Sequence, residues 1–95
     1  MDEFGFVFDK LSANYSEIEG MMSAIYDKLQ VNPENKELQN ILQGLGQIAK
    51  NIISTQMDFT EIYCDSSMKE SIMASLDNRQ ESLMDALDID KGRTL

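Results

Sequence analysis

The most constraining feature of the sequence is a run of eight apolar residues that alternate four and three positions apart. In an α-helix this spacing places every member on one narrow stripe, the seam of a heptad repeat. The seam consists of Phe4, Phe8, Leu11, Tyr15, Ile18, Met22, Ile25 and Leu29. It predicts an all-α chain with a first helix over residues 9–31. The seam can pack on the chain's own second helix or on another chain, and both interpretations are left open.

The first eight residues are ambiguous, because apolar side chains there also alternate with the period of two that is typical of a strand. Gly5 adds to this ambiguity, since glycine destabilises a helix by about 1 kcal/mol relative to alanine. Helical and non-helical conformations are therefore both left open for residues 1–8.

A turn is predicted at Asn32-Pro33, because a residue that precedes proline avoids helical geometry. The same pair can start a second helix, with Asn32 as the N-cap and Pro33 at the first helical position. Glu34 and Glu37 would then place negative charge at the positive end of the helix dipole. We therefore expect a second helix over residues 33–64, antiparallel to the first.

The second helix has a wide apolar face, which predicts contact with more than one neighbour. Its stripe consists of Leu38, Ile41, Leu45, Ile48, Ile52, Phe59 and Ile62, is interrupted by Thr55, and is broadened by Leu42, Ala49 and Tyr63. Gly44 and Gly46 lie within this segment at a cost to helix stability of about 1 kcal/mol each. They predict a bend or the close approach of another backbone.

A break near residues 63–67 is predicted, because the apolar stripe stops there and Ser67 with Glu70 matches a capping box. The alternative is one helix from residue 33 to 87, about 80 Å long, which the first helix alone cannot cover. The break favours a third helix over residues 67–88, followed by a flexible tail over residues 89–95. The apolar residues of this helix are Met68, Ile72, Met73, Leu76, Leu83, Met84 and Leu87. Residues 1–95 would then form a single small helical domain.

The third helix is also the acidic element of a chain whose net charge is −9. Residues 58–90 contain nine acidic and two basic residues. Negative charge repels phosphate backbones, so nucleic acid is disfavoured as a partner. The acidic face can be a solvated surface, a dock for a basic partner or a mimic of the DNA backbone, and these three interpretations are left open.

The amino-acid composition excludes most common kinds of catalytic site and metal site. With no His and a single Cys, the chain cannot assemble a His-ligated metal site, a His-based triad or an intrachain disulfide. The segment Asp88–Gly92 begins like a calcium loop but has its glycine one position early. We therefore expect a protein that is not an enzyme and has no cofactor, no metal site and no small-molecule substrate.

The cellular location is predicted from the lack of two sequence signals, a membrane-spanning apolar run and the basic start of a secretory signal peptide. No apolar run reaches the roughly 18–20 residues that span a bilayer, so no transmembrane segment is expected. The acidic start of the chain differs from the basic start of a secretory signal peptide. A cytoplasmic location is predicted, and export that is independent of such a signal is left open.

The segment from Tyr26 to Gln43 resembles the helix-turn-helix of type III secretion needle and rod subunits. The positions that fit or nearly fit that pattern are Asp27, Lys28, Leu29, Asn32, Pro33, Asn35, Leu38 and Gln43. The resemblance implies a helical hairpin that assembles with other subunits of a secretion system. After Gln43 the sequence departs from that family, because it lacks the family's basic end and runs longer.

The leading hypothesis is a non-enzymatic helical protein–protein interaction subunit of chaperone or assembly type, of a bacterial secretion system. Its partner would be another protein or a second copy of the chain. The alternative is a small acidic inhibitor that blocks a basic protein surface. The predicted partner-binding residues come from the first and third helices: Phe4, Phe8, Leu11, Tyr15, Ile18, Met22, Met68, Ile72, Met73, Leu76, Leu83, Met84 and Leu87.

Overall fold

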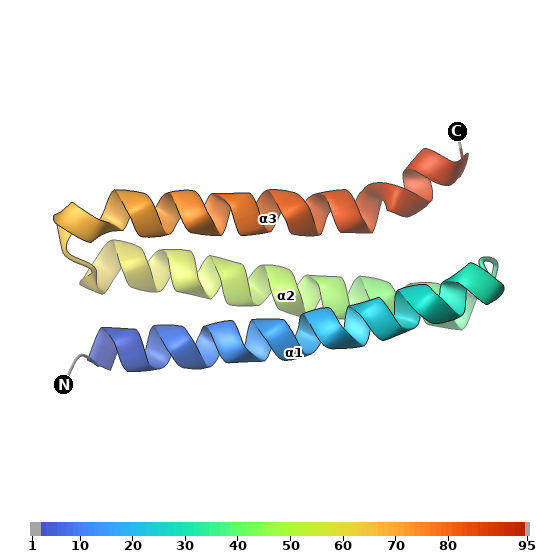
Figure 1. Ribbon diagram of the computed structural model, residues 1–95, viewed down its shortest axis with the longest axis horizontal. Coiled ribbons are helices and arrows are strands. Elements are labelled where there is room, and N and C mark those ends of the chain that lie inside the picture. Colours follow the sequence, from blue (N-terminus) through green and yellow to red (C-terminus); the bar gives the residue numbers. More distant parts are fainter. Residues whose placement is uncertain (1–2, 95) are drawn as a thin grey trace.

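The chain forms three long helices that lie side by side, with the second helix in the middle (Figure 1). The computed structural model describes residues 3–94, without the side chains of Ser66 and residues 88–94. The helices are α1 (Glu3–Val31), α2 (Lys36–Tyr63) and α3 (Ser66–Thr94). The molecule measures 47 × 25 × 15 Å. The predicted all-α class is confirmed, as an antiparallel hairpin of α1 and α2 with a third helix folded back on α2.

The start of α1 settles the ambiguity over residues 3–8, which are helical. The Phe4 ring stacks on Phe59 of α2, with ring centroids 5.3 Å apart and ring planes 7° apart. The Phe4 and Phe8 ring centroids lie 5.5 Å apart within α1. Burial of these aromatic faces offsets the helix penalty of Gly5. Met1 and Asp2 lie outside the described residues.

The turn between α1 and α2 corrects the predicted cap. The N-cap of α2 is Asn35, whose side-chain oxygen accepts a hydrogen bond of 3.1 Å from the backbone N–H of Leu38. Asn32 instead closes α1, because its N–H donates to the carbonyl of Lys28 at 3.0 Å. Because α2 begins only at Lys36, Asn32 and Pro33 lie before its cap, and Pro33 is part of the turn rather than the first helical residue.

The predicted break between the second and third helices is confirmed, but its capping box is wrong. Cys64 caps the end of α2 through its N–H, which donates to the Thr60 carbonyl at 3.0 Å. The Asp65 carbonyl accepts the first helical hydrogen bonds of α3, so Asp65 and not Ser67 holds the cap position. α3 continues to Thr94 and therefore includes residues 89–94 of the predicted tail.

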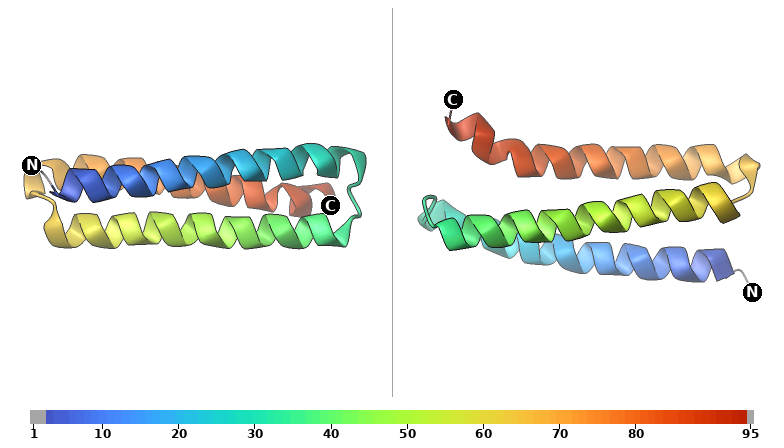
Figure 2. Two further views of the ribbon diagram at one scale, coloured as in Figure 1. Left: turned by 90° about the horizontal axis from the view of Figure 1, so that it is seen from below. Right: turned by 180° about the vertical axis from the view of Figure 1, so that it is seen from behind.

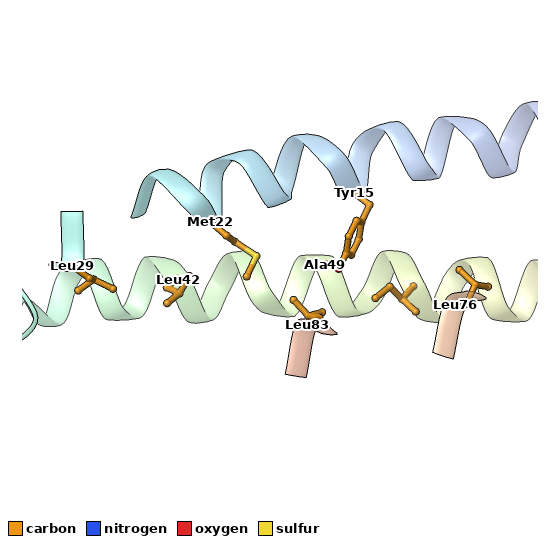
Figure 3. Close-up of a cluster of buried hydrophobic side chains, with 8 residues drawn as sticks. Tyr15, Met22, Leu29, Leu42, Ala49, Leu76 and Leu83 are labelled. Carbon is orange, nitrogen blue, oxygen red and sulfur yellow. The ribbon is translucent and has the colours of Figure 1, made fainter. Parts of the chain in front are cut away.

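Eight apolar side chains from all three helices form the buried core (Figure 3). They are Tyr15, Met22, Leu29, Leu42, Ala49, Ile53, Leu76 and Leu83. Within each helix they recur at spacings of seven or four residues, which keeps them on the face turned toward the other helices. Figure 3 shows Tyr15 and Met22 of α1 directed toward α2. The predicted seam of α1 thus packs on the chain's own second helix.

The buried face of α2 is rotated from the predicted stripe. Leu42, Ala49 and Ile53 are buried, whereas Ile41 and Ile48 of the predicted stripe are exposed by 42% and 47%. The physical reason is that α2 packs against α1 on one side and α3 on the other (Figure 2). The centre of its buried face therefore lies between these two contacts, and the stripe's outer members face solvent. The prediction that α2 covers more than one neighbour is confirmed.

The two glycines of α2 have different surroundings. A Cβ placed on Gly46 would lie 2.6 Å from Cδ2 and 2.8 Å from Cδ1 of Leu87. The predicted close approach therefore comes from a side chain of α3 and not from a backbone. No atom lies within 4 Å of a Cβ placed on Gly44, so packing within the chain does not require this glycine.

This difference predicts opposite stability effects for the same substitution. Gly44→Ala is expected to raise the free energy of unfolding by about 0.5–1 kcal/mol through helix propensity alone. Gly46→Ala is expected to lower it by about 1 kcal/mol, because Leu87 must move and overpacking exceeds the propensity gain. Urea unfolding at low protein concentration, followed by circular dichroism, measures both. Equal stabilisation by the two substitutions would contradict the packing of Leu87 on Gly46.

Candidate functional site

A pocket of about 360 Å³ lies at the end of the bundle where α1 begins and where α2 connects to α3. We call it the end pocket. It is lined by Phe4, Gly5, Phe8, Asp9, Tyr63, Cys64, Asp65, Met68 and Ile72. Because α1 and α3 begin at the same end of the molecule (Figure 1), residues more than fifty positions apart in the sequence share this pocket.

The aromatic wall of the end pocket includes Phe4 and Tyr63, and both of these rings contact Phe59, which does not itself line the pocket. The Phe4 ring stacks on Phe59, and the Phe59 and Tyr63 ring centroids lie 4.8 Å apart with the planes tilted by 51°. Such contacts add about 0.5–1.5 kcal/mol per pair to the effect of burial. The wall is therefore held in place before any ligand arrives, which lowers the entropy cost of binding.

The mouth of the end pocket exposes large apolar side chains. Tyr63 is 65% exposed and Met68 is 60% exposed. Asp9 and Asp65 line the same pocket, and both are exposed. No Lys or Arg occurs among the residues that line it. Aromatic and Met side chains are enriched where proteins bind one another. The pocket therefore offers an apolar surface with a negatively charged rim.

A second, smaller groove of about 190 Å³ runs between α1 and α3. It is lined by Tyr15, Glu19, Met22, Ser23, Tyr26, Ser82, Leu83 and Ala86. The Tyr26 hydroxyl donates a hydrogen bond to the Ala86 carbonyl across this groove. Tyr15, Met22 and Leu83 are almost fully buried, so they close the floor of the groove. This hydrogen bond ties the two outer helices together.

A third, open groove of about 680 Å³ lies between α2 and α3 and is acidic. Its lining residues are Lys50, Asp77, Gln80, Glu81, Met84 and Asp85. The three carboxylates follow one another at intervals of four residues, which places them along one side of α3. Lys50 of α2 supplies the groove's only positive charge among these lining residues.

A buried polar layer joins all three helices. Gln56 of α2 donates from Nε2 to the Ser12 hydroxyl at 2.9 Å and to the Phe8 carbonyl at 3.3 Å. Its Oε1 accepts from the Arg79 guanidinium at 3.2 Å. The same guanidinium lies 4.8 Å from the centroid of the Tyr15 ring. Gln56 has no exposed surface, so this layer belongs to the bundle's structure rather than to a ligand site.

The surroundings of the Tyr15 hydroxyl change its pKa. Burial raises the pKa of Tyr15 above its ordinary value of 10.0, and the negative charge of Glu19 raises it further. The positive charge of Arg79 acts in the opposite direction. The Tyr15 hydroxyl is therefore neutral across the physiological pH range.

The structure divides the predicted partner-binding residues into four groups. Phe4, Phe8, Met68 and Ile72 meet in the end pocket. Tyr15, Met22, Leu76 and Leu83 are buried in the core, whereas Leu11, Ile18, Met73 and Leu87 are half-buried in the bundle and Met84 lines the acidic groove. For the four core residues, a partner contact does not fit the closed bundle, because the chain's own helices already cover them.

Sequence reasoning missed the polar layer and most of the connection between α2 and α3. Gln56 lies seven residues after Ala49 and fourteen after Leu42, so its heptad position alone indicates burial. The contributions of Asp9, Cys64 and Asp65 to the end pocket left no periodic signal. These residues line the pocket because the folded bundle brings the start of α1 next to the connection between α2 and α3 and to the start of α3.

Among the side chains that the structure describes, in residues 3–87 apart from Ser66, no group of three or more His, Cys, Asp or Glu is placed to hold a metal ion. In the same part of the chain, none of the helices combines the length and the apolar character needed to cross a membrane. Comparisons of the chain with protein-family models, with curated proteins and with solved structures found no match.

Proposed function

We propose that the chain is a non-enzymatic protein–protein interaction subunit, of chaperone or assembly type, that binds a segment of another protein at the end pocket. The observation that carries this proposal is the exposure of Tyr63 and Met68 beside a preformed apolar pocket. Apolar side chains that gather at one exposed site mark interaction surfaces more reliably than scattered ones.

The chemistry of the end pocket supports a particular kind of segment. An apolar side chain would lie between the aromatic wall and Met68, and Lys or Arg residues beside it would face Asp9 and Asp65. The net charge of −9 would also attract a basic segment and raise its association rate. A basic amphipathic segment therefore fits this surface better than an acidic one.

A role in a secretion system rests on the local resemblance to needle and rod subunits around Asn32 and Pro33. The α1–α2 hairpin supports this part of the proposal, since those subunits are helical hairpins. α3 is an addition to that pattern. An export chaperone or an assembly factor that binds a basic segment of another component is consistent with both the α1–α2 hairpin and the additional helix α3.

Met68→Asp is the direct test of the end pocket. A suitable probe is a fluorescent amphipathic peptide with Leu on one helical face and Lys on the other. Met68→Asp is expected to weaken its binding about tenfold or more, because a charged group replaces a central apolar contact. Fluorescence anisotropy measures the dissociation constant.

Met21→Asp is the matched control, because Met21 is 50% exposed but does not line the end pocket. It adds the same negative charge at a comparably exposed methionine. Its effect is expected to stay below about twofold, as for a contact outside the energetic centre of an interface. Equal effects of the two substitutions would contradict binding at the end pocket.

The acidic groove favours a second candidate, a small inhibitor that blocks a basic protein surface. Asp77, Glu81 and Asp85 align along α3 as a run of phosphate-like charges. This candidate predicts competition with DNA for a basic protein and a steep loss of binding as salt rises. The combined change Asp77→Asn, Glu81→Gln and Asp85→Asn would remove that competition, and Met68→Asp would not.

A further inference from the structure

The outer side of α2 is uncharged, in contrast to the outer sides of α1 and α3. Between Glu37 and Asp58, α2 carries a single charged residue, Lys50, and this residue faces the acidic groove beside α3. The exposed residues of α1 and α3 include many carboxylates, such as Glu17 and Glu70. We define the α2 face by six exposed residues: Ile41, Gly44, Gln47, Ile48, Asn51 and Thr55.

Two features of the α2 face have no explanation within the single chain. Ile41 and Ile48 lie seven residues apart and are both exposed, although Ile is a poorer helix former than Lys or Glu. Gly44 lies between them and weakens the helix, yet nothing within 4 Å of its Cβ position requires a glycine. Gly46 differs, because the Leu87 side chain fills that space.

We propose that the α2 face binds the α2 face of a second copy of this chain. The two α2 helices would lie antiparallel about a two-fold axis near Gly44. This arrangement places Ile41 of one copy beside Ile48 of the other, twice per dimer, and lets the backbones approach closely at Gly44. An interface of this symmetry requires a surface that is complementary to itself, and the spacing of these three residues meets that requirement.

The distribution of charge favours a second copy of the chain as the partner of the α2 face. Each chain has a net charge of −9, so two copies repel one another through any face that carries carboxylates. The α2 face keeps those groups away from the contact. Its polar members carry amides, and the Gln47 side chain donates to Asn51 at 3.1 Å. Amides both donate and accept hydrogen bonds, so they can pair with the same groups of an identical chain, which carboxylates cannot.

The proposed dimer leaves the end pockets free and places them at opposite ends. Dimerisation therefore does not depend on the proposed function of the end pocket. If each end pocket binds a segment of another protein, the dimer would bind two such segments. Self-association can fail while peptide binding persists, and the reverse also holds. Met68→Asp, which tests the end pocket, is expected to leave self-association unchanged because Met68 lies outside the α2 face.

Sedimentation equilibrium over a wide range of protein concentration tests the proposal. The unmodified chain is expected to show a reversible monomer–dimer equilibrium. Ile48→Glu is expected to weaken dimerisation about thirtyfold or more, since each dimer contains this position twice. Asn78→Glu, at an exposed position of α3, is the matched control and is expected to change the constant by less than about twofold.

A cross-linking experiment tests the axis. In a Cys64→Ser background, Gly44→Cys places one thiol per chain near the proposed two-fold axis, within reach of a disulfide. Mild oxidation is expected to give a linked dimer from Gly44→Cys and not from Asn78→Cys. A chain that remains monomeric at every concentration would overturn the proposal and leave the α2 face to a different protein. Equal dimerisation of Ile48→Glu and Asn78→Glu, or equal cross-linking at the two positions, would also overturn it.

Discussion

Leu83→Ala is expected to lower the free energy of unfolding by about 3 kcal/mol, within the range measured for truncation of buried leucines. Leu83 is 3% exposed and belongs to the core on which α3 packs. The substitution removes buried methyl groups and leaves a cavity that rigid helices fill only partly. Urea unfolding monitored by circular dichroism measures the change.

Met84→Ala provides the matched control for this prediction. Met84 is the next residue of α3, and it is exposed on the acidic groove. Its truncation is expected to change stability by less than about 0.5 kcal/mol. If Leu83→Ala were as mild as Met84→Ala, α3 would not be packed on the hairpin as described.

Gln56→Ala is expected to lower the free energy of unfolding by about 2–3 kcal/mol, from a cavity and from the loss of three hydrogen bonds. The side chain is fully buried and bonds to Ser12 and the Phe8 carbonyl of α1 and to Arg79 of α3. Gln47→Ala is the control, because Gln47 is exposed and bonds only locally to Asn51. Equal costs for the two substitutions, measured by urea unfolding, would contradict the buried layer.

Gln56→Met separates packing from hydrogen bonding at the same position. Methionine conserves most of the volume, so its cost is expected to stay near 1 kcal/mol. We expect the polar layer also to fix the register of the three helices, as single polar residues do in coiled coils. Gln56→Met is therefore expected to broaden the amide spectrum of residues around Ser12 and Arg79, while the overall helix content remains.

The sequence predicts the helices well because their signals are local. The heptad seam of α1 is continuous, and it ends at the proline turn where the structure ends the helix at Val31. The loss of apolar residues at Tyr63 marks the end of α2 correctly. Each of these features depends on residues within one or two turns of one another, so the pattern alone contains them.

Most errors of the sequence-based prediction concern features that depend on contacts between residues far apart in the sequence. The caps are an exception, because the hydrogen bonds at Asn35 and Asp65 are local and lie three and two residues from the predicted cap positions. The buried face of α2 depends on the positions of both neighbouring helices, and the wide apolar stripe of α2 does not by itself show where its centre lies. The end pocket joins α1 to the α2–α3 connection, so its composition appears only once the bundle has closed.

Closure of the three-helix bundle decides which apolar residues of the chain remain exposed. Native-state hydrogen exchange of the isolated chain tests it most directly. We expect the amides of Leu76 and Leu83 in α3 to exchange with the same opening free energy as those of Leu42 and Ile53 in α2, since all four side chains share one core. Exchange of the α3 amides at the rate of an unfolded peptide, while α1 and α2 stay protected, would contradict it.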